Sequence, residues 1–482
     1  MGTVGLNFGS ATSGQGFDVT STVNQIVTNL QAVETPWKTQ LAGLESRDTA
    51  LSSIGTQLST LSSDLIALTD FQGTMAYKTG SSSDTNVLQL ISAGSTATAG
   101  THSIVVQNLA QTSSAASDAV GANDVLTGSI TFKVGTGAWQ TVNVGDFSTE
   151  ATISGLSAAI NAAGLDVQAS VLTNADGTQR LSLVSRISGS GGQITIADGT
   201  NNPSSPSTLA DSTNPDPNSA LGLKTVQDGL DAIMTVDGVQ ITSSSNTVTN
   251  AIPGVTFQLL APSPVTSSSG TPTAENVQVI ITNDTSSIES AINTFVNDYN
   301  AIVKSISAQE GKDSSGNPEP LYGSSVLAQL QQGLQSALSA KFGTGPIDSL
   351  IALGITANPA ADGTISLNTD TLNNSLDNNF SQVVSFFQDS GMFGATFQST
   401  LNSLGTSSSK GGAIALALKE DSSKERALND NIDRQEALIA TQKEHLTTQL
   451  NLANQILQSI PQQIQQVNEM YSAITGYNSK NG

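Results

Sequence analysis

The sequence predicts an α+β multidomain protein with a nested architecture, in which β-rich head domains are inserted into a helical leg domain that carries terminal coiled-coil helices. Three observations predict this. Apolar residues recur every seven positions near both ends of the chain. Between about residue 78 and residue 283, apolar and polar residues alternate between turns rich in Gly, Asn, Asp and Ser. After Asp284 the helical period returns.

The N-terminal part divides into a flexible segment over 1–37 and the first leg helix over 38–75. The chain starts with a Gly-, Ser- and Thr-rich stretch that can bury little apolar surface. Ten of the twelve heptad core positions that follow are apolar, which is typical of a coiled-coil or bundle helix. Pro36 is tolerated only in a first turn, so the regular helix is expected to start or kink there. The heptad series is Leu30, Trp37, Leu44, Leu51, Leu58 and Leu65.

The middle of the chain reads as strands, which we divide into three parts. A head domain is expected over 76–120 and again over 223–283, and an outer head domain over 121–222 is inserted into it. Within the outer head, 152–164 has a helical pattern. It precedes a predicted hairpin over 165–186, whose turn is the sequence "NADG".

The leg domain resumes over 284–420 with the stretch "TFVNDYNAIVKSI". Its apolar residues follow one another at spacings of four, three and four, which is the stripe of an amphipathic helix. Ser286 and Glu289 have the spacing of a capping box at its start. We expect this helix to pack beside the helix that carries Leu44 to Leu68. The predicted leg core is Phe295, Tyr299, Ile302 and Ile306.

A C-terminal coiled-coil helix is expected over 421–482. Its apolar residues repeat every seven positions from Ile432 to Ile474, and a second row joins them from Leu450. Pro461 lies inside this stripe and is expected to bend or break the helix.

The terminal stripes are either ordinary core helix or surfaces that pack on each other and on neighbouring subunits, and we favour the second. We expect the segments outside roughly 38–425 to be disordered in the isolated protein. We also expect Leu58→Asp or Leu450→Asp to abolish assembly while the heads stay folded. The candidate contact residues are Leu30, Trp37, Leu44, Leu51, Leu58, Leu65, Ile439, Leu446, Leu450, Leu457 and Ile464.

Composition argues against several classes of function. The net charge is −22, and the stretch from Ser81 to Val303 has four basic and 17 acidic residues, so the surface repels nucleic acid. No apolar run reaches the roughly 18 residues of a membrane span, and no secretory signal is evident at the start. The chain has no cysteine, which rules out disulfides and thiolate chemistry.

We find no pattern of catalytic or ligand-binding residues. The two histidines, His102 and His445, lack partners at the spacing of a triad or a metal site. The glycine clusters at 189–192 and 343–346 lack the residues of a phosphate-binding loop. The sequence therefore predicts a protein that is not an enzyme and has no cofactor and no metal.

Several segments together resemble the family of flagellar filament cap proteins, the FliD or hook-associated family. The stretch "FVNDYNAIVKSI", preceded by "VIITNDTSSIESAI", is similar to the junction between head and leg in that family. The segment 153–186 also resembles a small module of flagellins and hook-associated proteins. The other similar segments occur in the family's order, at 16–27, 95–111, 244–260 and 353–376.

The resemblance implies a cap at the tip of the bacterial flagellum and a role in motility. Such a protein is exported unfolded through the flagellar type III secretion apparatus, with an export chaperone, and is then secreted and extracellular. It forms a ring-like homo-oligomer that promotes flagellin insertion and polymerisation and prevents loss of flagellin monomers. Its implied partners are itself, flagellin and the hook–filament junction protein, with no nucleic acid and no membrane insertion.

Three alternatives stay open at this point. The chain could be a flagellin or a hook–filament junction protein, which would form long filaments where a cap forms small rings or plates. It could be a surface adhesin for cell adhesion, with heads that bind host glycan or mucin. It could also be a wall-cleaving hydrolase, although few aromatic residues are present to line a sugar cleft.

Overall fold

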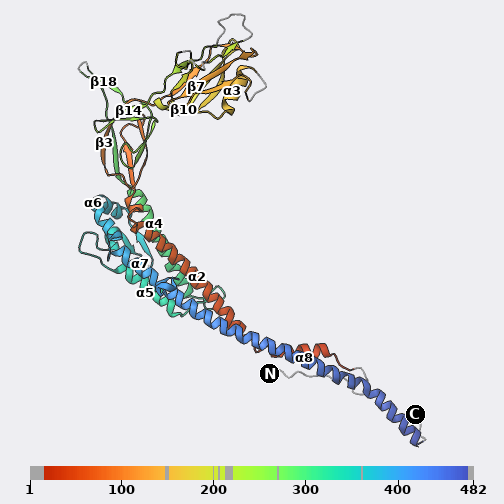
Figure 1. Cartoon of the computed structure of the whole chain (residues 1–482). Helices are drawn as coiled ribbons and strands as arrows, with labels where there is room; N and C mark the ends of the chain where they lie inside the picture. The colour runs from red at the N-terminus through yellow and green to blue at the C-terminus, as the bar shows by residue number, and fades with distance from the viewer. Residues whose placement is uncertain are drawn as a thin grey trace. The chain divides into compact units, whose positions relative to one another are not determined.

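The structure is a computed structural model that describes residues 16–146, 151–198, 200–202, 204, 207–211, 221–268, 271–359 and 362–475. The chain forms two compact units (Figure 1). Unit 1 comprises Met1–Asp70 and Glu289–Gly482, and unit 2 comprises Phe71–Ile288. The chain thus leaves unit 1 and returns to it, which confirms the nested α+β architecture.

Unit 1 is mainly helical. Helix α2 packs along α8 and against α7, and α5 packs on α7. Helix α4 begins within unit 2 and belongs to unit 1 from Glu289 onward. The helices are α1 (Val19–Gln31), α2 (Thr35–Thr69), α4 (Thr285–Gln309), α5 (Ser325–Ser339), α6 (Thr369–Gln388), α7 (Phe393–Leu404) and α8 (Ala413–Thr475). The short elements are η3 (Leu350–Leu353), β21 (Ile355–Ala357), β22 (Ile365–Leu367) and η4 (Ser408–Lys410).

The core of unit 1 contains the heptad leucines of α2 and a cluster of phenylalanines from α4 and α7. The second half of α2 buries Leu51, Ile54, Leu58, Leu61, Leu65 and Leu68, each at most 2% exposed. The α4 residues Phe295, Tyr299, Ile302 and Ile306 are likewise at most 1% exposed. Helix α4 contacts α2, as expected, since the Asp64 side chain of α2 forms a hydrogen bond with Asp298 of α4. Its ring contacts are with α7. The Phe295 centroid lies 6.2 Å from that of Phe393 and 5.5 Å from that of Phe397.

An eight-stranded antiparallel sheet forms one core of unit 2, in the order β15-β14-β3-β20-β1-β2-β17-β16. Its two edge strands are joined by only three residues, 244–246, whereas the edges of a flat sheet of this size would lie about 34 Å apart. The sheet therefore curls back on itself. The strands are β1 (Lys78–Ser82), β2 (Leu88–Ala93), β3 (Gly100–Asn108), β14 (Ala232–Val236), β15 (Val239–Ser243), β16 (Thr247–Thr249), β17 (Val255–Leu259) and β20 (Val277–Asn283).

Residues between Ala115 and Leu221 form a second hydrophobic core in unit 2. Helix α3 (Ile153–Ala162) packs against β9, and β9 pairs with β10 through the turn that contains the expected "NADG". Gly177 has a φ of +86° in that turn, a conformation that suits glycine. The main sheet has β4 (Thr112–Ala116), β5 (Val120–Gly121), β9 (Val167–Thr173), β10 (Thr178–Ser188) and β13 (Lys224–Gln227).

The remaining elements of unit 2 are short. A three-stranded sheet runs in the order β11-β7-β8, and two further pairs are β6 with β12 and β18 with β19. Their bounds are β6 (Leu126–Thr127), β7 (Ser129–Val134), β8 (Gln140–Asn143), β11 (Ile194–Ile196), β12 (Ala210–Asp211), β18 (Val265–Ser268), β19 (Thr271–Ala274), η1 (Thr74–Ala76) and η2 (Ser190–Gly192). That the outer head is a domain of its own stays a prediction.

The structure differs from the sequence predictions at both ends of the chain. Residues 19–31 lie within the segment expected to be flexible, and they form α1. Asp18 caps this helix and accepts a hydrogen bond of 3.1 Å from the Ser21 amide. Of the bend or break expected at Pro461, a break does not occur, since α8 runs through this residue. The carbonyl that loses its partner is that of Leu457, four residues before the proline, and Leu457 is half-buried between the exposed residues Ile456 and Gln458.

Candidate assembly interface

The candidate contact residues separate into buried and exposed groups along the helices of unit 1. Leu51, Leu58 and Leu65 are at most 2% exposed and belong to the core. Ile439 is 5% exposed. The others are half-buried, except Ile464, which is 43% exposed: they are Leu30, Trp37, Leu44, Leu446, Leu450 and Leu457. Leu58→Asp would therefore damage the core of unit 1 and would not report on assembly alone.

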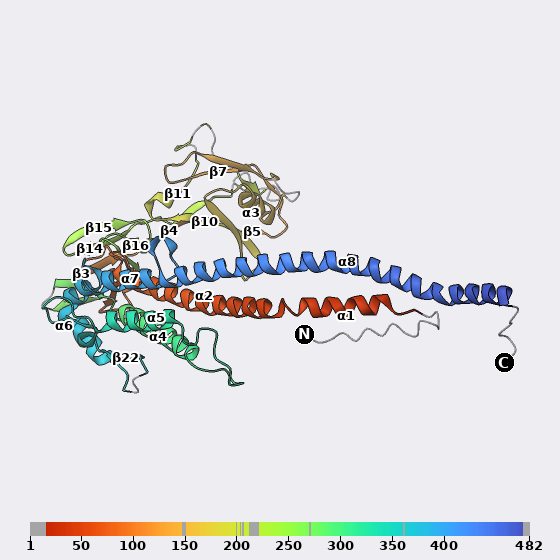
Figure 2. The ribbon, with the colours of Figure 1, turned by 90° about the horizontal axis from the view of Figure 1, so that it is seen from below.

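Helix α1 covers part of α8, as Figures 1 and 2 both show. Val19 and Val23 of α1 are buried. The Phe17 amide donates a hydrogen bond of 2.9 Å to the Asn454 side chain. Gly16, with a φ of +63°, allows this close approach, since a Cβ there would lie 2.1 Å from Asn454 Oδ1. Contact with α1 explains why α8 is half-buried around Leu450.

Beyond this contact, α8 exposes a row of large apolar side chains, which we call the distal stripe. Their spacing of mainly three and four residues places them on one face of the helix. Exposed apolar patches are typical of surfaces that contact another protein, so the distal stripe is a candidate contact surface. Sequence reasoning missed Met470, which neighbours the heptad position Tyr471. The distal stripe is Ile464, Val467, Met470, Tyr471 and Ile474, exposed by 43%, 58%, 63%, 60% and 84%.

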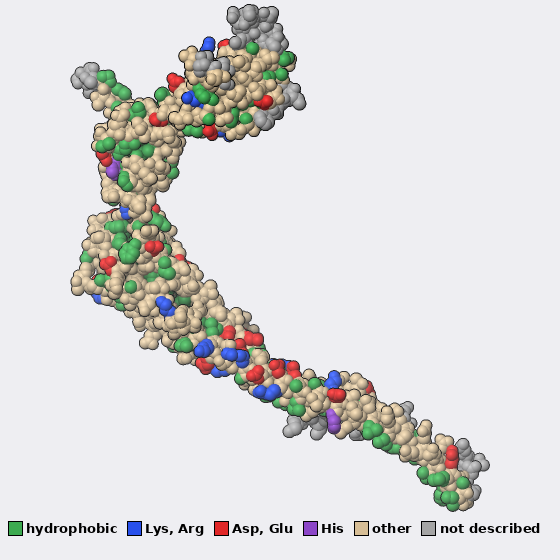
Figure 3. Space-filling view, viewed as in Figure 1, with side chains coloured by type: hydrophobic (Ala, Val, Ile, Leu, Met, Phe, Trp, Pro, Cys, Tyr) green, Lys and Arg blue, Asp and Glu red, His purple; other side chains and the backbone are tan. Residues whose placement is uncertain are grey.

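The charge of α8 changes abruptly along its length. Twelve of the 26 residues from Lys419 to Glu444 are charged, whereas Glu469 is the one Asp, Glu, Lys or Arg from 446 to 475. Figure 3 shows charged side chains over the middle of α8 and hydrophobic ones toward its C-terminal end. The distal part thus carries little charge that would oppose burial in an assembly.

Ion pairs hold the charged part of α8 to α2. Lys38 Nζ lies 3.1 Å from Glu436 Oε1, and Arg47 Nε lies 2.9 Å from Asp421 Oδ2. The Asp421 side chain is completely buried, so Arg47 is the cation that compensates it most closely.

Two carboxyl groups of α2 titrate near neutral pH. Burial raises the pKa of Asp48 to about 6, and the negative charges of Glu425 and Asp421 add to this effect. Burial also raises the pKa of Asp64 to about 6, with a further contribution from its hydrogen bond to Asp298 of α4. Unit 1 therefore contains two carboxyl groups that bind a proton at a higher pH than an ordinary aspartate does.

As the pH is raised from about 5 to about 8, we expect the free energy of unfolding of the variant Asp48→Asn/Asp64→Asn to fall less than that of the wild type. Each carboxyl group has a pKa of 3.8 in the unfolded chain and of about 6 in the folded one. It therefore stabilises the folded state fully below pH 3.8, and this stabilisation is lost as the pH rises through about 6. At the higher pH, the free energies of unfolding of the variant and the wild type should differ by roughly 1 kcal/mol per site. Urea unfolding of unit 1, followed by its helical signal, measures it.

Asp313→Asn is the matched control for this prediction. The backbone amide of Asn317 lowers the pKa of Asp313, so its contribution is constant over the same pH range. Equal pH dependence in the double variant and the wild type would contradict the assignment.

A groove of about 540 Å³ lies between α2 and α8 and offers a second contact surface. Small and apolar side chains form the floor of the groove. Arg47 and Lys424 contribute positive charge to its lining. Grooves between two packed helices are a common docking site for a third helix. The lining residues are Gln40, Gly43, Leu44, Arg47, Lys424, Ala427, Leu428 and Asn431.

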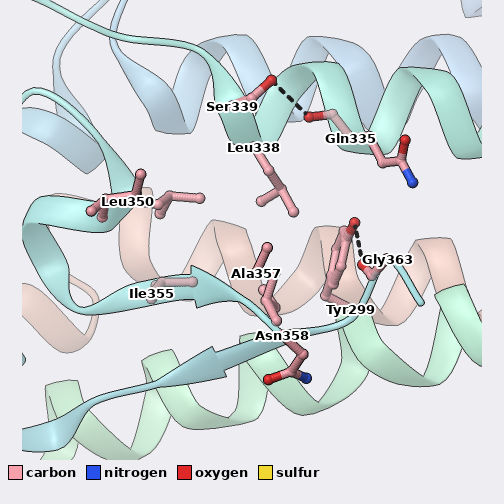
Figure 4. A pocket seen from close by; sticks show the side chains of 11 residues that line it. Tyr299, Gln335, Leu338, Ser339, Leu350, Ile355, Ala357, Asn358 and Gly363 are labelled. Carbon is pink, nitrogen blue, oxygen red and sulfur yellow. Dashed lines mark hydrogen bonds between the residues drawn. The ribbon is translucent and has the colours of Figure 1, made fainter. Parts of the chain in front are cut away.

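A separate apolar pocket of about 330 Å³ lies among α4, α5 and the hairpin β21–β22 (Figure 4). The Tyr299 hydroxyl donates a hydrogen bond of 3.4 Å to the Gly363 carbonyl, and burial raises the pKa of Tyr299 to about 12. The phenol therefore stays protonated and serves as a donor. Leu338, Leu350 and Ile355 line the pocket with apolar surface.

The described ranges contain no group of three His, Asp or Glu side chains placed to hold a metal ion. His102 Nδ1 lies 2.7 Å from Asp237 Oδ2, and this hydrogen bond lowers the pKa of Asp237. No helix among the residues that the structure describes has the length and apolarity to cross a membrane.

Comparison with known families agrees with this arrangement. Residues 229–473 match the family model "Flagellar hook-associated protein 2 C-terminus", and residues 15–113 match "Flagellar hook-associated protein 2 N-terminus". The chain belongs to the flagellar hook-associated protein 2 family. The two family models include α1, α2 and α8, whereas residues 114–228, with most of the second core of unit 2, lie between them.

Relatives in the flagellar hook-associated protein 2 family match over most of the chain. The B-type protein of Pseudomonas aeruginosa is 30% identical over 388 residues, which are 77% of this chain and 78% of that one. The protein of Escherichia coli K12 is 26% identical and covers 92% of this chain and 96% of its own. The crystal structure of the D1-D2-D3 domains of the E. coli flagellar cap protein FliD is 25% identical, with a TM-score of 0.54, and covers 77% of this chain and 99% of its own.

Proposed function

We propose that this chain is a flagellar filament cap protein. It self-assembles at the tip of the filament, promotes flagellin insertion and polymerisation, and prevents the loss of flagellin monomers. The observation that carries this proposal is the match of both family models, which together include every helix that forms the candidate assembly interface.

The structure supports a role in which surfaces meet and no covalent step is needed. The distal stripe supplies an apolar face that gains free energy when a partner covers it. The α2–α8 groove supplies a place for an additional helix. We propose a homo-oligomeric ring with flagellin, the hook–filament junction protein, an export chaperone and the type III apparatus as partners, in an extracellular location and without enzyme activity.

Imaging of filament tips tests the function directly. Cells of the source organism in which the gene is deleted should release flagellin monomers into the medium and carry few or short filaments. Labelled antibody against this chain should mark the distal ends of wild-type filaments. Purified protein should form small rings or plates by electron microscopy and by mass measurement. Long filaments of the purified chain would instead indicate a flagellin, and normal filaments in the deletion strain would refute the proposal.

A further inference from the structure

A cluster of charged side chains lies where the buried part of α2 meets the α2–α8 groove. From Leu51 onward α2 buries an apolar face, whereas Arg47 just before it lines the groove. Asp48 lies between these two parts. We call residues 51–68 the core half of α2 and residues 35–47 its outer half. The cluster therefore stands at the boundary between a part of the helix that is fixed by burial and a part that is not.

The cluster contains more carboxyl groups than cations. Arg47 Nε lies 2.9 Å from Asp421 Oδ2, and Lys424 Nζ lies 3.9 Å from Asp421 Oδ1. Lys424 is also engaged by Glu420, whose Oε1 lies 2.7 Å from Nζ. Asp48 forms no ion pair with a residue that the structure describes. Two residues of α2 and four of α8 make up the cluster: Arg47, Asp48, Glu420, Asp421, Lys424 and Glu425.

Two carboxyl groups of the cluster meet without a hydrogen-bond donor. The Asp421 side chain is completely buried. Both of its carboxylate oxygens, and Oδ1 of Asp48, are buried and accept no hydrogen bond from the described part of the chain. The two side chains are close enough to form a hydrogen bond with each other once one of them is protonated, because an ionised carboxylate can only accept. A proton on Asp48 supplies the donor that these oxygens lack.

The surroundings of Asp48 favour this proton. Burial raises the pKa of Asp48 to about 6, the negative charges of Glu425 and Asp421 add to the effect, and Arg47 opposes it. Above that pH, two carboxylates face each other away from water, with a third negative charge nearby. Both the repulsion and the loss of hydrogen bonds are relieved when the two helices move apart and water enters.

Little else holds the outer half of α2 to α8. Among the described residues of α2, none before Leu51 is buried. Lys38 Nζ lies 3.1 Å from Glu436 Oε1, but the two side chains are 52% and 54% exposed. Ion pairs at this exposure stabilise a contact only weakly. The charge balance at Asp48 therefore has a large influence on whether the outer half stays packed.

We propose that the contact between Asp48 and Asp421 is a proton-operated latch of the α2–α8 packing. With the proton in place, the outer half of α2 stays on α8. When the proton is lost, the outer half separates from α8, and the core half stays in place because its leucines are buried. The groove then opens, and the half-buried side chains of Leu44 and Leu428 become exposed. The surface that unit 1 offers to a partner thus depends on pH.

The direction of the pH dependence follows from proton binding. The closed state binds the proton more tightly than the open state, in which Asp48 has the ordinary pKa of 3.8. Opening is therefore least favoured below pH 3.8 and increases as the pH rises through about 6. The latch is a property of the single chain, so it does not rest on the proposed function.

The test measures the separation of the two helices across the groove as the pH is raised from 5 to 8. The chain has no cysteine, so Gln40→Cys/Asn431→Cys places one spin label on each side of the groove. The labels should give one short distance at pH 5 and a growing population of longer distances through about pH 6. Hydrogen exchange, corrected for its intrinsic rate, should show about a fivefold loss of protection in the outer half. The core half should lose less.

Three variants locate the effect. Asp48→Asn keeps the shape and gives Asp421 a permanent donor, so it should stay closed from pH 5 to pH 8. Asp430→Asn removes an exposed carboxyl group of α8 and should open like the wild type. Asp64→Asn removes the other α2 carboxyl group with a raised pKa, which contacts Asp298 of α4, and should also open like the wild type. Melting curves at pH 5 confirm that each variant folds.

Three results would overturn the latch. The first is a wild type whose label distances and exchange rates stay the same from pH 5 to pH 8. The second is opening of Asp48→Asn at the same pH as the wild type. The third is opening that responds to added sodium or calcium at constant pH and not to pH itself, which would assign the cluster to a metal ion.

Discussion

Ile464→Asp/Tyr471→Asp should abolish assembly at the filament tip and leave the melting temperature of the purified chain unchanged. Both side chains belong to the distal stripe and are 43% and 60% exposed, so the variant removes little internal packing. Surface substitutions of this kind usually change stability by about 0.5 kcal/mol or less. In an assembly, however, each new carboxylate would be buried without a partner, which costs several kcal/mol. Antibody labelling of filament tips and thermal melting measure the two effects separately.

The matched control is Gln462→Asp/Gln465→Asp. These exposed residues lie on the opposite face of the same helical turns, so the variant adds the same two charges away from the distal stripe. The control should retain assembly at the tip. Equal assembly by both variants would show that the distal stripe is not a contact surface.

Leu58→Asp should unfold unit 1 while unit 2 remains folded. Leu58 is 2% exposed within the core of unit 1, so a carboxylate there would be removed from water. The loss should exceed about 4 kcal/mol, which is a large part of the stability of an ordinary domain. Unit 2 has its own cores, so its amide protons should keep their protection in hydrogen exchange.

Leu58→Met provides the control for that experiment. It conserves volume and polarity and should cost less than about 1.5 kcal/mol. Loss of protection in unit 2 together with unit 1 would show that the two units fold as one. Unchanged melting of Leu58→Asp would show that the α2 core is not where the structure places it.

The sequence could predict helices and their inward faces, because a seven-residue period depends only on positions along one helix. The sequence could not predict which residues of an apolar stripe are buried by a neighbouring helix. Leu58 and Ile464 occupy equivalent positions in their stripes, yet one is 2% and the other 43% exposed. The difference arises from which helices lie alongside, and that is set by contacts between residues hundreds of positions apart. Asp18 and Ser21 were a local signal for α1 that the composition of the N-terminal segment obscured.

Charge clusters were likewise beyond a reading of the sequence. Asp48 meets Asp421, and Asp64 meets Asp298, only when α2, α4 and α8 pack together. Lys224 of β13 likewise pairs with Ala116 of β4, more than a hundred positions away in the sequence, and only the fold brings them together.

The insertion of unit 2 also affects how unit 1 can fold. The 218 residues of unit 2 separate α2 from the part of α4 that belongs to unit 1. Once unit 2 is folded, Lys78 and Asn283 are neighbours in its sheet, so it acts as a linker of about a dozen residues. The shorter effective loop lowers the entropic cost of closing unit 1 by about 2.5 kcal/mol. A chain that emerges N-terminus first would therefore gain from completing its middle before its ends meet.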